Sequence, residues 1–371
     1  MYQHNPKGFN EMQNPEKILI VRLSAVGDVT HVLPALRCLR HHYPHANITW
    51  LVEDRAAGLL EGHPDLDEVI IFPRKRWREG ILGPIKLLNT ASSVSGFLRE
   101  LRAKRFDVAI DFHGNLKSGV MTFLSGAPIR IGFARGHCRE YNHLFTNRHV
   151  TPPKDRMHRV KKYLSLLTAL GIKPTYERST ISVPLEDRDY ITKSLETFIN
   201  RPGPLVVIHP GTSEFGSYKR WPAKSFAELG NMLVKELGAQ VVVSWGPAEL
   251  DMAKEIISGM NEGGHLAPKT GTLTQLASVI GQSDLFISGD TGPMHIASVL
   301  GVPQIAIFGP KDPVIYGPYN EHSTVVRKDA DCSPCTKRTC DDPICITAIT
   351  PDEVFVAAKD LLAKKVEVEN N

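Results

Sequence analysis

Short apolar runs alternate with amphipathic stretches along most of the chain. In the first half the apolar runs predict strands near residues 18–23, 48–52, 69–72, 108–111 and 129–132, with helices near 32–42, 85–104, 117–125 and 157–170. The second half continues the pattern, with strands near 205–209, 241–244, 285–288 and 304–308 and helices near 224–237, 249–258, 273–280, 294–300 and 352–365. This alternation is typical of parallel α/β proteins.

The chain of 371 residues is longer than one ordinary domain, so two domains are expected. The segment 171–174, Gly-Ile-Lys-Pro, interrupts the helical pattern near the middle of the chain. We expect a flexible extension over residues 1–16, an N-terminal domain over 17–183 and a C-terminal domain over 184–371. The extension lacks the apolar core of a signal peptide, and no apolar run approaches the roughly 18 residues of a membrane span. These features favour a cytoplasmic location.

Two turns place glycines between a predicted strand and a predicted helix, at residues 24–31 and 289–295. Glycines let the backbone approach a ligand closely, and a helix N-terminus offers unpaired N–H groups to an anion. Ligands of open parallel sheets bind outside the carboxyl ends of the strands. One such crevice in each half predicts two doubly wound domains that face each other across a cleft, where two substrates would meet.

Basic residues are concentrated in the first half of the chain. Residues 1–180 carry 27 Lys and Arg against 16 Asp and Glu, a balance of +11, whereas residues 181–371 carry 17 against 24, a balance of −7. A solvated basic surface is one explanation, and a binding face for an anionic partner is the other. Since the sequence contains no nucleic-acid-binding motif, a phosphorylated acceptor or a membrane surface is favoured over nucleic acid.

Asp28 follows Gly27 at the predicted start of a helix in the first crevice. As an N-cap this residue would have a structural role only. At the mouth of a crevice, its carboxylate is suited to accept a proton from a hydroxyl nucleophile. His31, about one helical turn further along the chain, is the alternative base or anion contact.

Polar and small residues follow several predicted strands of the second half. Lys219 ends a loop that begins with Thr212 and Ser213, and an ammonium group beside hydroxyls and N–H groups suits a diphosphate. Glu249, where a helix begins, is suited to accept hydrogen bonds from a ribose diol. The second crevice contributes Asp290, Thr291, Gly292 and His295.

Other common site motifs are absent or poorly placed. The sequence has no G-x-G-x-x-G after its first strand and no P-loop. Three D-x-D triplets, at residues 65–67, 187–189 and 329–331, do not follow predicted strands and are discounted as metal sites. Cys332, Cys335, Cys340 and Cys345 have a spacing that departs from common zinc pairs, so free or redox-labile thiols are favoured over a metal site. We assign no metal site.

Taken together, these motifs resemble the lipopolysaccharide heptosyltransferases of glycosyltransferase family 9. The resemblance covers nearly the whole chain after residue 16. It is carried by ILIVRLSAVGDV at 18–29, LPAL at 33–36, HPGT at 209–212, KRWP at 219–222, SGDTGPMH at 288–295 and CSPC at 332–335. It implies a GT-B fold, in which two Rossmann-like domains bind the acceptor and the nucleotide sugar.

The resemblance also implies the reaction. An inverting transfer would move heptose from ADP-L-glycero-β-D-manno-heptose to Kdo-lipid A or heptosyl-Kdo-lipid A, without a required cofactor or metal. Asp28 then matches the proposed general base and Lys219 the diphosphate-binding lysine, with Thr212 and Ser213 near the phosphates. Glu249 matches the ribose-binding acid. The donor-site turn comprises Asp290, Thr291, Gly292 and His295.

The partners of the N-terminal domain are expected from charge and position alone. The candidate acceptor-binding residues are Arg55, Arg74, Lys75, Arg76, Lys117, Arg135 and Arg139. A peripheral contact with the cytoplasmic face of the inner membrane is expected through Arg74, Lys75, Arg76 and Arg78, with the Trp77 ring at the headgroups. The alternatives are a GT-B sugar-nucleotide epimerase, a non-catalytic sugar-nucleotide sensor, or a transferase of another nucleotide sugar.

Overall fold

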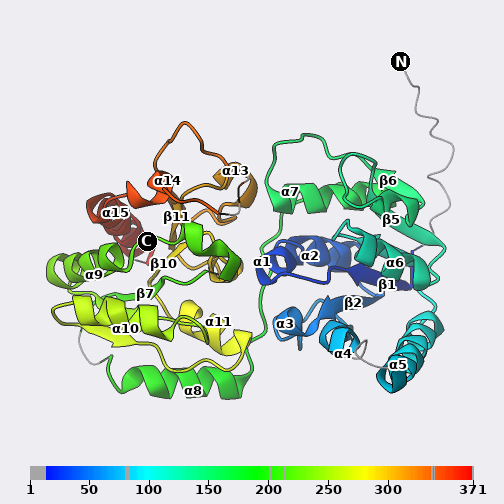
Figure 1. The fold of residues 1–371 in the computed structure, drawn as a ribbon, viewed down its shortest axis with the longest axis horizontal. Coiled ribbons are helices and arrows are strands. Elements are labelled where there is room, and N and C mark those ends of the chain that lie inside the picture. Colours follow the sequence, from blue (N-terminus) through cyan, green and yellow to red (C-terminus); the bar gives the residue numbers. More distant parts are fainter. Residues whose placement is uncertain are drawn as a thin grey trace. The chain divides into compact units, whose positions relative to one another are not determined.

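The computed structural model describes residues 14–79, 84–199, 202–212, 214–335, 337 and 339–369. The chain divides into two compact units, Met1–Ser179 and Thr180–Asn371. Figure 1 traces both units along the sequence, and each is described below by itself.

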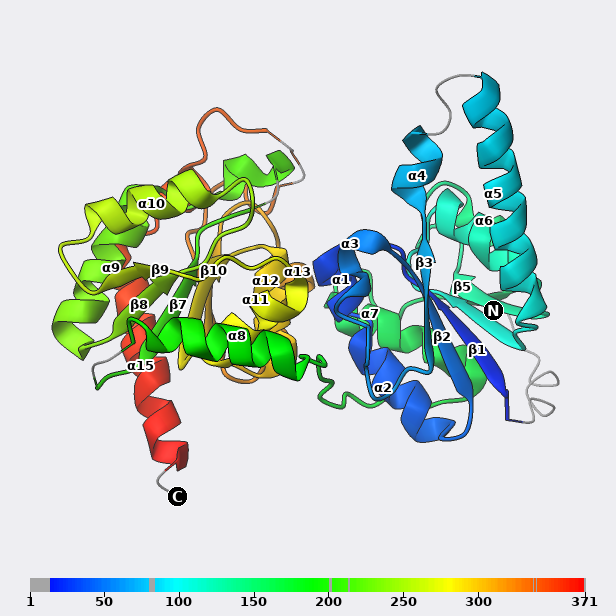
Figure 2. The same ribbon diagram turned by 90° about the horizontal axis from the view of Figure 1, so that it is seen from below.

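Unit 1 is built on a six-stranded parallel sheet with the order β3-β2-β1-β4-β5-β6. The strands are β1 (Lys17–Val21), β2 (Asn47–Glu53), β3 (Glu68–Phe72), β4 (Val108–Asp111), β5 (Ile129–Phe133) and β6 (Arg148–Val150). The helices are α1 (Val26–Thr30), α2 (Leu33–His42), α3 (Asp54–Ala57), α4 (Arg74–Glu79), α5 (Pro84–Ala103), α6 (Leu116–Leu124) and α7 (Arg159–Leu164), with 3₁₀ turns at Asn142–Leu144 and Ser165–Leu170. In Figure 2, α2 and α7 lie on one face of the sheet and α5 and α6 on the other.

Unit 2 repeats this plan with the strand order β12-β11-β10-β7-β8-β9. The strands are β7 (Leu205–His209), β8 (Gln240–Val243), β9 (Gly264–Leu266), β10 (Leu285–Gly289), β11 (Gln304–Phe308) and β12 (Ser323–Arg327). The helices are α8 (Leu185–Glu196), α9 (Ala223–Leu237), α10 (Leu250–Gly259), α11 (Leu273–Gly281), α12 (Gly292–Leu300), α13 (Pro313–Tyr316), α14 (Ile344–Thr347) and α15 (Pro351–Glu369), with a 3₁₀ turn at Glu214–Lys219. Helices α9, α10 and α15 pack together, as do α8, α11 and α12.

Burial explains why the central strands form where the apolar runs predict them. Every residue from Ile18 to Val21 in β1 is fully buried, as is every residue from Val206 to Ile208 in β7. A parallel strand covered on both faces needs such a continuous apolar run. Both sheets have the strand order of a Rossmann fold, so the predicted class, two doubly wound α/β domains, is confirmed.

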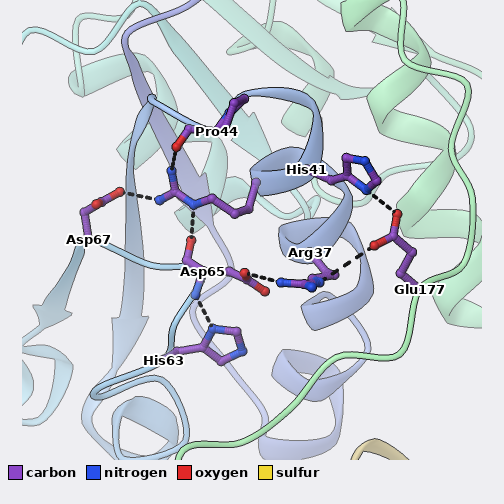
Figure 3. Close-up of polar contacts among 8 residues, drawn as sticks. Arg37, His41, Pro44, His63, Asp65, Asp67 and Glu177 are labelled. Atoms are coloured by element: carbon purple, nitrogen blue, oxygen red, sulfur yellow. Dashed lines mark hydrogen bonds and ion pairs between the residues drawn. The ribbon is translucent and has the colours of Figure 1, made fainter.

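A polar network ties α2 to the loop between β2 and β3 (Figure 3). Arg37 forms an ion pair with Asp65 at 2.8 Å, and Arg40 with Asp67 at 2.6 Å. Glu177 reaches the same helix through His41, with 2.8 Å between Nδ1 and Oε1. The first D-x-D triplet therefore links α2 to the loop before β3 through two ion pairs.

The other two triplets also have structural partners. Asp187 accepts hydrogen bonds from Thr274 and Gln275 at the start of α11. Asp329 forms an ion pair with Arg327 at 2.9 Å.

Candidate active site

Each sheet has one point where the chain reverses its direction of winding, and ligands of such folds bind there. In unit 1 this point lies between β1 and β4, and in unit 2 between β7 and β10. The loops after β1 and after β10 are the two glycine-containing turns predicted from the sequence.

Asp28 is the third residue of α1 and is not its N-cap. The N-cap is Ala25, which provides no side-chain hydrogen bond, so the interpretation of Asp28 as a cap is wrong. Instead, its Oδ2 lies 2.6 Å from Nη2 of Arg22. The carboxylate is thus paired with a cation, and the backbone N–H of Ala25 also binds it.

Arg22 is itself fixed in the interior of unit 1. Its side chain is almost fully buried, its Nη1 donates to the carbonyl oxygen of Phe112 at 2.8 Å, and its guanidinium lies 5.2 Å from the centre of the Tyr163 ring. The side chain of Asp28 remains 39% exposed, so a ligand can reach it.

The charge around Asp28 keeps it ionised. Burial raises the pKa of the Asp28 carboxyl, but the positive charges of Arg22 and Arg159 outweigh that effect and hold the pKa below its usual value. His31, the alternative base, is buried and packs edge-to-face on His158, with 5.5 Å between the ring centres. Exposure and charge both favour Asp28 as a proton acceptor.

Glu53 is a residue that the sequence reasoning missed. It lies buried at the carboxyl end of β2, where its Oε1 binds Nζ of Lys117 and its Oε2 lies 3.3 Å from Nη1 of Arg74. Two of the candidate acceptor-binding residues therefore meet on one carboxylate. A buried acid directly after a strand was the available signal.

The other acceptor candidates are spread over unit 1. Arg55 is exposed on α3, Lys75 is exposed on α4, and Arg135 and Arg139 are exposed in the segment after β5. The side chain of Arg76 lies outside the described residues.

Trp77 does not have the position expected for a headgroup contact. Its ring packs against Phe72 and Phe97, with ring centres 5.1 and 5.4 Å apart, and its Nε1 donates to Oγ of Ser93 at 3.2 Å. It anchors α4 to the core.

In unit 2, Lys219 and Asp290 form an ion pair. Nζ of Lys219 lies 2.6 Å from Oδ2 of Asp290, and both side chains are mostly buried. The N-cap of α12 is Thr291, the residue after Asp290. Since Asp290 follows β10 directly, this pair brings the Lys219 ammonium to the reversal point.

Thr212 accepts a hydrogen bond from Arg220, with 2.9 Å between Nε and Oγ1, and Nη2 of Arg220 reaches its carbonyl oxygen at 3.0 Å. Arg220 is thus a second cation of this loop that the sequence reasoning left without a role. Ser213 lies outside the described residues.

Glu249 caps α10 and lies against the turn that follows β7. Its Oε2 accepts from the N–H of Gly246 at 2.7 Å and lies 3.6 Å from Nε2 of His209. A Cβ on Gly211 would lie 2.0 Å from the Glu249 carboxyl carbon, so only glycine leaves room for this carboxylate. Burial lowers the pKa of His209, although the charge of Glu249 opposes that shift.

The second glycine-containing turn leads into α12. Thr291 is the N-cap, Gly292 is the first helical residue, and His295 is buried one turn later. Lys219, Thr212, Glu249 and Asp290 thus all follow β7, β8 or β10, three adjacent strands of unit 2. This edge combines cations, backbone N–H groups and a carboxylate, the groups that suit a nucleoside diphosphate.

The cysteine-rich segment lies next to the carboxyl end of β11. The N–H of Cys335 donates to the carbonyl oxygen of Pro310 at 2.6 Å, and Cys345 is buried near Gly309. Cys332, Cys335, Cys340 and Cys345 are free thiols. Within the described ranges no group of three or more His, Cys, Asp or Glu side chains is arranged to hold a metal ion.

A cavity of about 1200 Å³ lies elsewhere in unit 2, lined by residues such as Phe198, Gln240 and His265. Because Gln240 begins β8, this cavity lies at the amino edge of the sheet and does not include the candidate site.

None of the helices in the described part of the chain combines the length and apolarity that crossing a bilayer requires.

Comparison with known proteins identifies similar sequences over most of the chain. The model of glycosyltransferase family 9 (heptosyltransferase) matches residues 94–344. Lipopolysaccharide heptosyltransferase 1 of Salmonella typhimurium is 30% identical, over 86% of this chain and 94% of its own. Lipopolysaccharide core heptosyltransferase OpsX of Haemophilus influenzae is 27% identical, over 84% of each chain.

Solved structures show the same fold. A family 9 glycosyl transferase of Veillonella parvula has a TM-score of 0.79 and 25% identity, covering 94% of this chain and 97% of its own. E. coli heptosyltransferase WaaC with ADP has a TM-score of 0.75 and 26% identity, and the match covers 93% of this chain and 99% of that one.

Proposed function

Because this chain belongs to glycosyltransferase family 9, we propose that it transfers heptose from ADP-L-glycero-β-D-manno-heptose to the inner core of lipopolysaccharide. The acceptor is Kdo-lipid A or heptosyl-Kdo-lipid A. Relatives named as lipopolysaccharide heptosyltransferases and a similar structure that contains ADP support this proposal.

The observation that carries the proposal is the group of side chains at the carboxyl edge of unit 2. The Lys219 ammonium is held at the reversal point by Asp290, and the Glu249 carboxylate lies against the adjacent turn. A cation beside a helix N-terminus suits a diphosphate, and a carboxylate one strand away suits a ribose diol. Thr212, Ser213, Thr291, Gly292 and His295 complete the proposed donor site.

Asp28 is the proposed general base. Its carboxylate accepts the proton of the acceptor hydroxyl while that oxygen bonds to the anomeric carbon of the heptose. The bond from this carbon to the diphosphate oxygen breaks, and ADP leaves with the bonding electron pair. Attack opposite the leaving group inverts the anomeric centre. Lys219 and the first N–H groups of α12 stabilise the charge that develops on the diphosphate.

We also infer that the protein works at the cytoplasmic face of the inner membrane, as a peripheral protein. The +11 balance of residues 1–180 supports this location, because both phosphorylated lipid A and anionic lipid attract basic residues. Arg55, Arg74, Lys75, Arg76, Lys117, Arg135 and Arg139 are the proposed acceptor contacts.

The test is a comparison of nucleotides and acceptors. ADP should raise the thermal midpoint of the protein more than UDP or GDP, and ADP should be released from ADP-heptose only when Kdo-lipid A or heptosyl-Kdo-lipid A is added. Conversion of the sugar nucleotide without any acceptor would indicate an epimerase. Binding of ADP-heptose without turnover, both with and without an acceptor, would indicate a sensor.

A further inference from the structure

His113 lies in the turn after β4, at the reversal point of unit 1, and no role has been assigned to it above. The turn also carries Gly114, whose φ of +72° is a left-handed conformation that favours glycine. His113 is partly buried, and the charges that act on its ring come from Arg22, Asp28, Lys117 and Arg139. Arg22 directly follows β1, Asp28 lies on α1, Lys117 lies on α6, and Arg139 lies in the segment after β5.

Asp111 fixes the backbone of this turn. Its fully buried carboxylate accepts from the N–H groups of His113 and Gly114 at 2.9 and 3.0 Å through Oδ1. Oδ2 accepts from Oγ of Ser118 at 2.8 Å and from Nδ2 of Asn142 at 2.7 Å. Because four donors bind one buried carboxylate, the turn has little conformational freedom. The backbone that carries the His113 side chain is therefore fixed.

One ring nitrogen of His113 is occupied by the protein. The N–H of Leu23, at the end of β1, donates to Nδ1 at 3.3 Å. A nitrogen that accepts a hydrogen bond carries no proton, so in the neutral ring the proton lies on Nε2. The described residues offer no hydrogen-bond acceptor to this Nε2–H.

The surroundings keep the ring neutral. Burial is the main cause that lowers the pKa of His113 to about 3, and the positive charges of Arg22, Lys117 and Arg139 lower it further, while Asp28 opposes them. Near neutral pH the ring has one proton, on the outer nitrogen, and cannot accept another there.

We propose that His113 is an acceptor-binding residue whose Nε2–H donates a hydrogen bond to an oxygen of the lipopolysaccharide acceptor beside Asp28. This role rests on the proposed function. A neutral donor at this position holds the acceptor without competing for the proton that Asp28 removes. A protonated ring would instead add a cation next to the base.

Two substitutions separate this role from a structural one. His113→Asn places an amide oxygen near the position of Nδ1, where it can accept from Leu23, but provides no donor at the outer position. His113→Gln places an amide N–H near the position of Nε2. If the ring only accepts the hydrogen bond from Leu23, His113→Asn should keep the kcat/KM of the wild type. If the ring donates to the lipopolysaccharide acceptor, His113→Gln should keep it instead.

We expect His113→Asn and His113→Ala to lower kcat/KM for Kdo-lipid A by about tenfold to a hundredfold, the effect of one lost buried hydrogen bond. His113→Gln should stay within about threefold of wild type, and KM for ADP-heptose should be unchanged in all three. Wild-type kinetics for His113→Asn would overturn the proposal.

A second measurement needs no turnover. The ¹⁵N resonances of the His113 ring should show an unprotonated Nδ1 and no titration between pH 8 and pH 5. A proton on Nδ1, or a midpoint near the ordinary value of 6.5, would contradict the assignment. If the wild type binds Kdo-lipid A but transfers nothing, the proposed function fails. Binding of Kdo-lipid A to the Asn and Gln variants then still decides the role of His113.

Discussion

At the scale of single residues, two ion pairs involve the groups that the proposed reaction uses. Arg22 lies 2.6 Å from the Asp28 carboxylate in unit 1, and Asp290 lies 2.6 Å from the Lys219 ammonium in unit 2. The first group is the proposed acceptor of a proton and the second the proposed stabiliser of negative charge. Their substitution should therefore affect different steps.

Asp28→Asn should lower turnover by about a hundredfold or more, because the amide cannot accept the proton of the acceptor hydroxyl. Affinity for ADP, measured by calorimetry, should be nearly unchanged. Asp54→Asn, a change of an exposed acid at the start of α3, is the matched control and should leave turnover intact. Turnover of the Asp28 variant within a few-fold of wild type would assign the base to another group.

The pH profile tests the same residue. A base acts when deprotonated, so activity is present above its pKa and is lost as the pH falls through it. Since the pKa of Asp28 lies below its ordinary value, kcat/KM should show no acidic limb between pH 5 and pH 8. An acidic limb centred near 6.5 would point to a histidine such as His31.

Lys219→Ala should lower turnover and weaken ADP binding together, because the ammonium offsets charge on the bound and the departing diphosphate. Lys224→Ala is the control, since that side chain is 88% exposed on the next helix. Chelation with EDTA should leave transfer unchanged in the wild type. A strict requirement for Mg²⁺ or Mn²⁺ would contradict this mechanism.

At the scale of elements, the connection after β7 depends on a close approach of the Gly211 backbone to the Glu249 side chain. Gly211→Ala would place a methyl group 2.0 Å from the Glu249 carboxyl carbon and displace that carboxylate. We expect weaker ADP binding, measured by calorimetry, with little change in the thermal midpoint. Gly281→Ala in α11, whose Cβ would make an ordinary 3.7 Å contact with Leu300, is the control. Equal ADP affinity in both variants would exclude Glu249 from the donor site.

The sequence predicted the inner strands of both sheets and the edge strand β3, and missed the edge strands β6, β9 and β12. Strands β1, β4, β7 and β10 are continuous apolar runs because both of their faces are covered. The edge strands β6, β9 and β12 are short or only partly buried, and their mixed polar residues leave no periodic signal. Helix α8 was missed for a similar reason, since it buries only Ile191 and Leu195.

The candidate site was only partly predictable for a different reason. Asp28 and Lys219 follow apolar strands, so position and chemistry point to them together. Their partners Arg22 and Asp290 also follow strands, β1 and β10, but the sequence does not show which acid pairs with which cation, since one pair is six residues apart and the other 71. The capping role considered for Asp28 failed because Ala25 occupies the N-cap position and the Asp28 carboxylate pairs with Arg22. The contacts of Glu53 and His113 become visible only when the carboxyl ends of neighbouring strands are brought together.

At the scale of the whole molecule, the excess of basic residues in the first half predicts binding to anionic surfaces. Each basic residue near such a surface contributes about 1 kcal/mol at low salt. Binding to anionic vesicles, measured by sedimentation, should therefore fall steeply as salt rises.

Changing Arg74, Lys75, Arg76 and Arg78 together to glutamine should weaken this binding and leave ADP affinity unaffected. Trp77 should be kept, because it packs against Phe72 and Phe97 in the core of unit 1. If the quadruple variant sediments as well as the wild type does, these residues are not the contact surface. The basic excess would then serve the phosphates of the acceptor.

The most direct test of the proposed reaction is the structure of its product. Wild-type protein incubated with ADP-heptose and Kdo-lipid A should yield the acceptor enlarged by one heptose, detected by mass spectrometry. NMR of the new linkage should show an anomeric configuration opposite to that of the donor. The Asp28→Asn variant should give almost none of this product in the same time. An unchanged acceptor in the wild-type mixture, or a linkage with the configuration of the donor retained, would contradict the proposed reaction.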